Sequence, residues 1–216
     1  MMSTCVLLSG GLDSAVLVHR LLARHQRVLP LYVRCGLRWE RVELYWLRRW
    51  LAACRSPRLL SLTIIDVPIR STYGPHWSLA GHYVPDRDSP DEAVELPGRN
   101  LLLISHAAMV CAQRRITTIA LGILKGNPFR DATPRFFASL ATVIAQALRA
   151  PLRIVTPLRR MSKSQVIRAG HGVPWHLTFS CLQPRGHRHC GRCNKCAERQ
   201  RAFYTAGVSD PTRYAS

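Results

Sequence analysis

Residues 9–14 of the chain, Ser-Gly-Gly-Leu-Asp-Ser, combine the residue types that bind a phosphate chain. The two glycines can take positive φ and let a phosphate approach the main chain without meeting a Cβ atom. The two serine hydroxyls add hydrogen-bond donors. Asp13 would repel a phosphate unless a cation lay between them, so we expect this carboxylate to bind Mg²⁺ or to cap a helix. The simpler alternative is a capped helix after a tight turn.

Four of the eight cysteines cluster near the C-terminal end with the spacing C-x₈-C-x₂-C-x₂-C: Cys181, Cys190, Cys193 and Cys196. Two-residue spacings let successive thiolates turn back onto one ion, and the fourth completes a tetrahedron. The pattern predicts a structural zinc knuckle, and an iron–sulfur cluster is the alternative. His187 and His189 are expected at the surface or beside a substrate. The remaining cysteines favour small core positions: Cys5, Cys35, Cys54 and Cys111.

The elements that position these residues alternate between short apolar runs and helical periodicity, which predicts a parallel sheet covered on both faces. Strands are expected in the run ending before Ser9 and at 27–33, 59–67, 117–122 and about 153–156. Helices are expected from Asp13 onward and at 39–53, 101–114, 133–149 and 163–169. Pro30 suggests that the second strand is an edge or is distorted. Ligands of such sheets bind at the carboxyl ends of the strands, where residues 9–14 would lie.

Between these elements, residues 68–98 lose all periodicity and read as a long polar loop with aromatic and acidic residues. Loops of this length in a compact domain tend to be functional or disordered. We expect residues 70–95 to form a lid.

Length and composition favour one domain with a small appendage, which we divide into residues 1–170 and a zinc-binding segment, 171–216. No apolar stretch is long enough to span a membrane and no signal-peptide pattern is present, so a cytoplasmic location is expected. The formal net charge of +19 fits a nucleic-acid partner or attraction of polyanionic ATP, although the arginines are scattered and form no block.

The glycine loop at residues 9–14 resembles the PP-loop of the N-type ATP pyrophosphatases, which cleave ATP between its α- and β-phosphates. It is not a Walker P-loop, because no Gly-Lys-Ser/Thr follows. Together with Pro97-Gly98-Arg99-Asn100, a late lysine and the C-terminal Cys-Gly-x-Cys-x-x-Cys, it resembles the 7-cyano-7-deazaguanine synthase family across essentially the whole chain. The resemblance implies a Rossmann-like α/β fold of the adenine nucleotide alpha hydrolase-like class with a C-terminal zinc knuckle.

The same resemblance implies a ligase of the queuosine pathway that uses ATP and Mg²⁺ to adenylate 7-carboxy-7-deazaguanine. Ammonia then gives the amide, and a second activation dehydrates the amide to 7-cyano-7-deazaguanine. Family members are zinc-bearing homodimers. No glutaminase domain is present in this sequence, so the ammonia would be free or supplied by a partner.

By position, the resemblance assigns the ATP phosphates to Leu8, Ser9, Gly10, Gly11, Leu12, Asp13 and Ser14. It assigns catalytic roles to Asp13, Ser14, Arg99 and Lys163. Substrate contacts fall on Arg38, Arg99, Asn100, Phe129 and Asp131, and zinc on the four clustered cysteines. A cation at Lys163 would stabilise the departing pyrophosphate, and the alternative is a solvated lysine at a helix start. Asp131 could accept from the amidine edge of a guanine-like base or act as a helix N-terminal charge.

Two segments that face the base in the family depart from its pattern. Residues 34–40, Arg-Cys-Gly-Leu-Arg-Trp-Glu, keep the glycine and arginine and lose a glutamine and a histidine. Residues 129–133 keep the aspartate and lose a cysteine and an arginine. These changes leave open a divergent ligase for another carboxylate. The high positive net charge keeps a tRNA-modifying member of the PP-loop group as an alternative. Another alternative is a nucleic-acid-binding protein that has a zinc knuckle and a PP-loop without catalytic activity.

Overall fold

Five parallel strands form the centre of the computed structural model, which describes residues 3–215. Their order across the sheet is β3-β2-β1-β4-β5, so the chain starts in the middle and builds outward in both directions. The strands are β1 (Ser3–Leu7), β2 (Arg27–Arg34), β3 (Thr63–Asp66), β4 (Thr118–Ala120) and β5 (Arg153–Val155). The predicted parallel sheet is confirmed.

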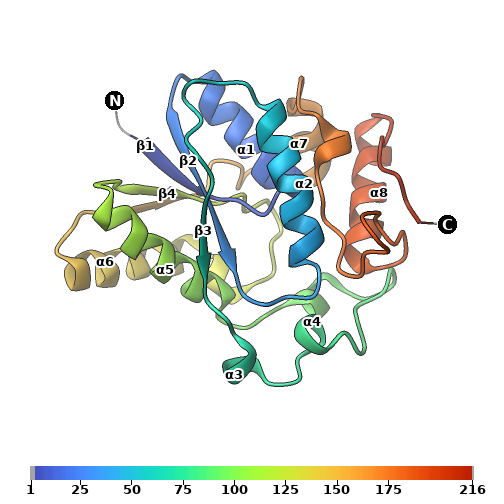
Figure 1. Ribbon diagram of the computed structural model, residues 1–216, viewed down its shortest axis with the longest axis horizontal. Coiled ribbons are helices and arrows are strands. Elements are labelled where there is room, and N and C mark those ends of the chain that lie inside the picture. Colours follow the sequence, from blue (N-terminus) through green and yellow to red (C-terminus); the bar gives the residue numbers. More distant parts are fainter. Residues whose placement is uncertain (1–2, 216) are drawn as a thin grey trace.

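Helices cover both faces of this sheet, as predicted. Figure 1 shows α5 and α6 on one face, α1, α2 and α7 on the other, and α8 packed outside α7. The long helices are α1 (Leu12–Ala23), α2 (Glu40–Ala53), α5 (Arg99–Gln113), α6 (Pro134–Leu148), α7 (Lys163–Ala169) and α8 (Asn194–Ala206). Short elements are α3 (Arg70–Tyr73), α4 (Trp77–Ala80) and the 3₁₀ turns η1 (Asp91–Val94), η2 (Arg130–Ala132) and η3 (Trp175–Leu177). No helix within residues 3–215 is both long and apolar enough to cross a membrane.

Alternation along the central strands creates two apolar cores, one on each face. Cys5 and Leu31 belong to the core under α5 and α6, whereas Val6 and Val28 belong to the core under α1 and α2. Each of these side chains is almost completely buried. Burying one such aliphatic side chain stabilises the fold by roughly 2 kcal/mol, so the sheet is held from both sides.

Pro30 lies in an interior strand, so the edge alternative is wrong and the alternative of a local distortion holds. The N–H of Val28 points toward β3, where it donates to the Arg58 carbonyl at 2.9 Å. Residue 30 has the same orientation, but proline has no N–H to donate. The regular ladder between β2 and β3 begins only at Leu31 and Thr63. This gap explains why β3 is shorter than the predicted strand at 59–67.

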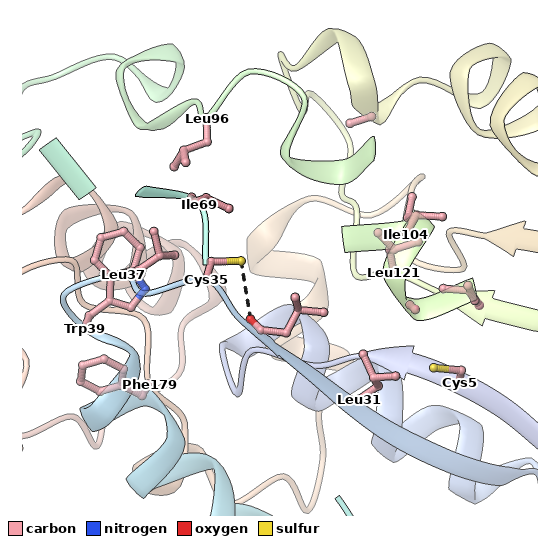
Figure 2. Packing of buried hydrophobic residues seen from close by; sticks show 14 of the residues in the cluster. Cys5, Leu31, Cys35, Leu37, Trp39, Ile69, Leu96, Ile104, Leu121 and Phe179 are labelled. Atoms are coloured by element: carbon pink, nitrogen blue, oxygen red, sulfur yellow. Dashed lines mark hydrogen bonds between the residues drawn. The ribbon is translucent and has the colours of Figure 1, made fainter. Parts of the chain in front are cut away.

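Residues 68–98 are a structured loop with two short helices and one 3₁₀ turn. Figure 2 shows Ile69 and Leu96, at the two ends of this loop, near each other in the same buried cluster as Leu31 and Ile104. The middle of the loop is attached to α8, because Asn194 donates its backbone N–H to the Pro85 carbonyl at 3.0 Å. The Asn194 side-chain amide also donates to the Ser89 carbonyl at 2.8 Å.

Helix α8 is held in place by a buried arginine. The Arg199 side chain is 1% exposed and donates to Thr178 Oγ1 at 2.9 Å, to the Trp175 carbonyl at 3.0 Å and to Thr212 Oγ1 at 2.5 Å. Its guanidinium also lies 5.2 Å from the centre of the Phe203 ring. A buried charge is tolerated only when its donors are satisfied, so these contacts fix α8 against its neighbours.

Replacing this arginine should destabilise the fold strongly. We expect Arg199→Ala to lower the free energy of unfolding by about 3 kcal/mol, since it removes the buried group that joins Thr178 to Thr212 and leaves Asp210 without this cation. Denaturant titration followed by circular dichroism measures this change. Arg201→Ala, at an exposed position on the same helix, is the control and should stay within about 0.5 kcal/mol of the parent. Equal stabilities for the two variants would contradict this account of α8.

Candidate active site

The glycine loop lies between β1 and α1 at the carboxyl edge of the sheet, as expected. Gly10 has φ of 81°, and a Cβ atom there would lie 3.3 Å from the Leu47 Cβ. Gly11 is the N-cap of α1, and no side chain caps the helix. The helix-cap interpretation of Asp13 is therefore wrong. The uncapped N–H groups and the positive end of the helix dipole leave a site for an anion.

A chain of alternating charges borders this loop. Lys163 Nζ lies 2.6 Å from Asp13 Oδ2 and 3.1 Å from Glu198 Oε1, and Lys195 Nζ lies 2.9 Å from Glu198 Oε2. Burial alone would lower the pKa of Lys163, but the two carboxylates more than offset this effect and raise it. Lys163 therefore carries a charged ammonium group that two carboxylates fix in place, and it is not a solvated lysine.

Helix α7 presents Lys163 from its first turn, and its start is well defined. Ser162 accepts a hydrogen bond from the Gln165 N–H at 3.3 Å, and the Gln165 side chain accepts from the Ser162 N–H at 2.8 Å. This capping box fixes the first turn of the helix. The predicted helix at 163–169 is confirmed.

The second carboxylate oxygen of Asp13 is buried and, among residues 3–215, has no hydrogen-bond partner. A buried, unpaired carboxylate oxygen is unfavourable unless a cation or donor completes it. Its position next to the uncapped helix end fits a hard cation such as Mg²⁺, which binds through carboxylates and phosphates.

A cavity of about 260 Å³ opens beside the loop at the ends of β1, β2 and β4. It brings together most of the positions that the sequence assigned to ATP and substrate: Leu8, Ser9, Gly11, Asp13, Ser14, Arg99, Asn100, Phe129 and Asp131. Its apolar wall includes Leu31, Leu96 and Leu121, which Figure 2 shows as members of one buried cluster. Gly10 and Leu12 adjoin the cavity in the chain and do not line it.

Two residues expected to contact the base are engaged elsewhere. Asp131 accepts from the Asn100 backbone N–H at 2.8 Å and from the Asn100 side-chain amide at 2.9 Å, so its carboxylate holds the start of α5. Arg38 does not line this cavity and donates to the Ala80 carbonyl at 2.6 Å. It therefore holds the 68–98 loop.

Glu43 is a cavity residue that the sequence reasoning missed. It lines the 260 Å³ cavity and a second cavity of about 210 Å³ on the other side of the loop. Its Oε2 accepts a hydrogen bond from the Tyr32 hydroxyl at 2.5 Å, and burial raises its pKa to about 7. One signal was available, because Glu43 shares its helical face with the apolar Leu47 and Trp50.

The four clustered cysteines form a site for a metal ion. Their sulfur atoms all lie within 4.8 Å of one another, and all four residues are buried. Backbone N–H groups point at the sulfurs, including Cys190 N to Cys181 Sγ at 3.2 Å and Cys193 N to Cys190 Sγ at 3.3 Å. Such donors stabilise thiolates, so the residues fit a tetrahedral metal.

The two histidines near this cluster differ from each other. His189 is buried between Phe179 and Tyr214, and its Nε2 accepts from the Ser180 N–H at 3.2 Å. Burial lowers its pKa to about 3, so it is neutral. The prediction of a surface position is wrong for His189. His187 is exposed, and its ring contacts that of Tyr45 at a centroid distance of 4.0 Å with a tilt of 39°.

The buried carboxyl of Glu43 should make stability depend on pH. The pKa of this carboxyl is 4.5 in the unfolded chain and about 7 in the folded protein. Between these two pH values the carboxyl is protonated in the folded state and ionised in the unfolded state. The free energy of unfolding therefore falls as pH rises from about 4.5 to 7, by roughly 3 kcal/mol from this group. Glu43→Gln should remove this slope. Denaturant titrations of both proteins between pH 5.5 and 8 test this, and parallel profiles would contradict it.

Solved structures with similar backbones support the fold. A predicted subunit of a tRNA methyltransferase from Methanocaldococcus jannaschii superposes with a TM-score of 0.53 and 13% identity, over 100% of this chain and 93% of that one. A 4-thiouridine synthetase, solved as an RNA complex with bound ATP, superposes with a TM-score of 0.55 and 14% identity, over 95% of this chain and 50% of that one.

Relatives in sequence identify the family of this chain. The family profile described as queuosine biosynthesis protein QueC matches residues 3–207. The 7-cyano-7-deazaguanine synthase of Sinorhizobium fredii is 34% identical over 99% of this chain and 92% of its own length. That of Ruegeria pomeroyi is 33% identical over 99% of this chain and 95% of its own. These matches favour the synthase over a ligase for another acid, and the chain belongs to the 7-cyano-7-deazaguanine synthase (QueC) family, whose members are ATP-dependent ligases.

Proposed function

We propose that this chain converts 7-carboxy-7-deazaguanine to 7-cyano-7-deazaguanine with the ATP triphosphate on residues 8–14 and the base in the 260 Å³ cavity. The observation that carries this assignment is the junction of the two cavities. Asp13, Glu43 and Arg99 line both of them. A carboxylate held on one side and a triphosphate on the other would meet at this junction.

The first reaction needs positioning and charge neutralisation more than a protein nucleophile. A carboxylate oxygen of the substrate attacks the α-phosphorus, and the bond to the pyrophosphate breaks. Lys163 neutralises charge on the pyrophosphate, and Asp13 would hold Mg²⁺ against the phosphates. Arg99 neutralises the carboxylate as it approaches the phosphate. Ammonia then attacks the acyl carbon, and AMP leaves with formation of the amide.

The second reaction uses the same site. The amide oxygen attacks a second ATP at the α-phosphorus and displaces pyrophosphate. Loss of both protons from the amide nitrogen and departure of AMP then give the nitrile. Phe129 can stack on the base, because it lines the cavity beside Asn100. The bound ATP of the 4-thiouridine synthetase, which has the same fold, supports a nucleotide in this cleft. The homodimer implied by the resemblance and the cytoplasmic location expected from the sequence stay predictions.

We further propose that the four cysteines bind Zn²⁺ in a small segment, residues 171–216, that packs on the PP-loop domain. Four buried thiolates leave no open position, so the ion would be structural. It would fix the turn from which α8 begins, since Cys193 is the N-cap of that helix.

Turnover with defined variants tests the activity. Purified protein with Mg²⁺, ATP, ammonium and 7-carboxy-7-deazaguanine should release AMP and pyrophosphate, and mass spectrometry should show the amide and then the nitrile. Lys163→Ala and Asp13→Asn should each lower kcat by about 10²-fold or more, because each removes charge stabilisation from the phosphates. Arg135→Ala, at an exposed position on α6, is the control. Folded wild-type protein that converts none of the acid would refute the proposed function.

Metal analysis tests the zinc proposal. We expect about one zinc per chain and no visible absorbance from an iron–sulfur cluster. Chelation should lower the melting temperature, because the metal contributes folding energy. Cys196→Ser should bind less zinc and melt earlier, while Cys54→Ser, at a cysteine outside the cluster, should keep its zinc. Iron with sulfide, or a full loss of metal without any change in melting, would contradict a structural zinc.

A further inference from the structure

The lysines of this chain are few and lie in one place. Among 31 basic residues only Lys125, Lys163 and Lys195 are lysines, and all others are arginines. All three line one cavity of about 410 Å³ next to Asp13. Lysine differs from arginine in having a compact, rotatable ammonium that can move between several acceptors. The cavity therefore concentrates the groups suited to following a polyphosphate as it leaves.

Glu198 joins two of these lysines. Its Oε1 lies 3.1 Å from Lys163 Nζ and its Oε2 lies 2.9 Å from Lys195 Nζ. The three side chains are only 22%, 22% and 27% exposed, so the contacts are partly shielded from solvent. An exposed i,i+3 pair on a helix contributes little. The additional contact to Lys163, from another helix, makes Glu198 a bridge.

The cysteine cluster sets where this bridge lies. Cys193 is the N-cap of α8 and Cys196 is in its first turn. Lys195 lies between these two metal-site residues, and Glu198 follows within one turn. The first turn of α8 cannot shift without moving the contacts of Glu198 with Lys163 and Lys195. The cysteine cluster is thereby connected to the phosphate site through the side chains of Lys195 and Glu198.

We propose that Glu198 is a positioning residue that holds Lys163 and Lys195 at the phosphate loop, and that Lys195 is a second cation for the departing pyrophosphate. This inference rests on the proposed function. In the free site two carboxylates balance two ammonium groups. A cation bound with ATP at the unpaired oxygen of Asp13 would share this carboxylate with Lys163, and Glu198 keeps the ammonium in place. With the charge of Asp13 shared in this way, the two lysines would present net positive charge to the phosphates.

Two measurements on Glu198→Gln test the positioning role. Calorimetry with Mg·ATP and with pyrophosphate, without any acid substrate, should show about tenfold weaker binding, because glutamine cannot pair with two ammonium groups. In turnover, the KM for ATP should rise by a similar factor while the KM for 7-carboxy-7-deazaguanine stays unchanged. Glu198→Asp should recover part of the loss. Zinc content should match the parent, which shows that α8 and the cysteine cluster are intact.

Further variants separate the outcomes. Lys195→Gln should weaken product inhibition by pyrophosphate more than it raises the KM for ATP. Glu92→Gln makes the same chemical change at an exposed position and should behave like the parent. If Glu198→Gln binds and turns over ATP as the parent does, the bridge is only structural and the inference is wrong. If the parent binds pyrophosphate in a Glu198-dependent way and converts no acid, the proposed function fails and the bridge stands.

Discussion

The ammonium group of Lys163 lies between two carboxylates, one from each end of the chain, at 2.6 Å from Asp13 and 3.1 Å from Glu198. Partly buried charges are stable only when they are paired, so α1, α7 and α8 must meet at this point. The helices do pack in that order, with α7 between the other two.

Some residues expected to contact ligand instead hold the backbone of the site. Asp131 holds the start of α5 through Asn100, and Arg38 holds the 68–98 loop through Ala80. These residues lie in the two segments whose sequences depart from the family pattern. These polar contacts among protein groups hold the backbone around the site, and the 260 Å³ cavity keeps an apolar wall.

Features that depend on local sequence were predictable, and those that depend on distant contacts were not. The glycine loop, the Thr133 and Ser162 helix starts and the cysteine spacing are each encoded within a few residues, and the structure contains them all. Glu198 resembles any surface acid in the sequence, because its partner Lys163 is far away in the chain. His189 was misplaced for the same reason, since Phe179 and Tyr214 bury it. For Pro30 the sequence left an edge and a distortion as alternatives, and only the pairing of β3 shows that its missing N–H falls at a gap in the ladder.

The arrangement of charges has a consequence for how the protein is made. Lys163 and Asp13 are separated by 150 positions, and Glu198 comes later still. Because ribosomes release the N-terminal part first, the glycine loop emerges long before its cation and the bridge that holds it. Until α8 has emerged, the sheet, whose last strand ends at Val155, carries Asp13 without its full set of partners. The nascent chain therefore has no complete phosphate site, and nucleotide cannot stabilise it during synthesis.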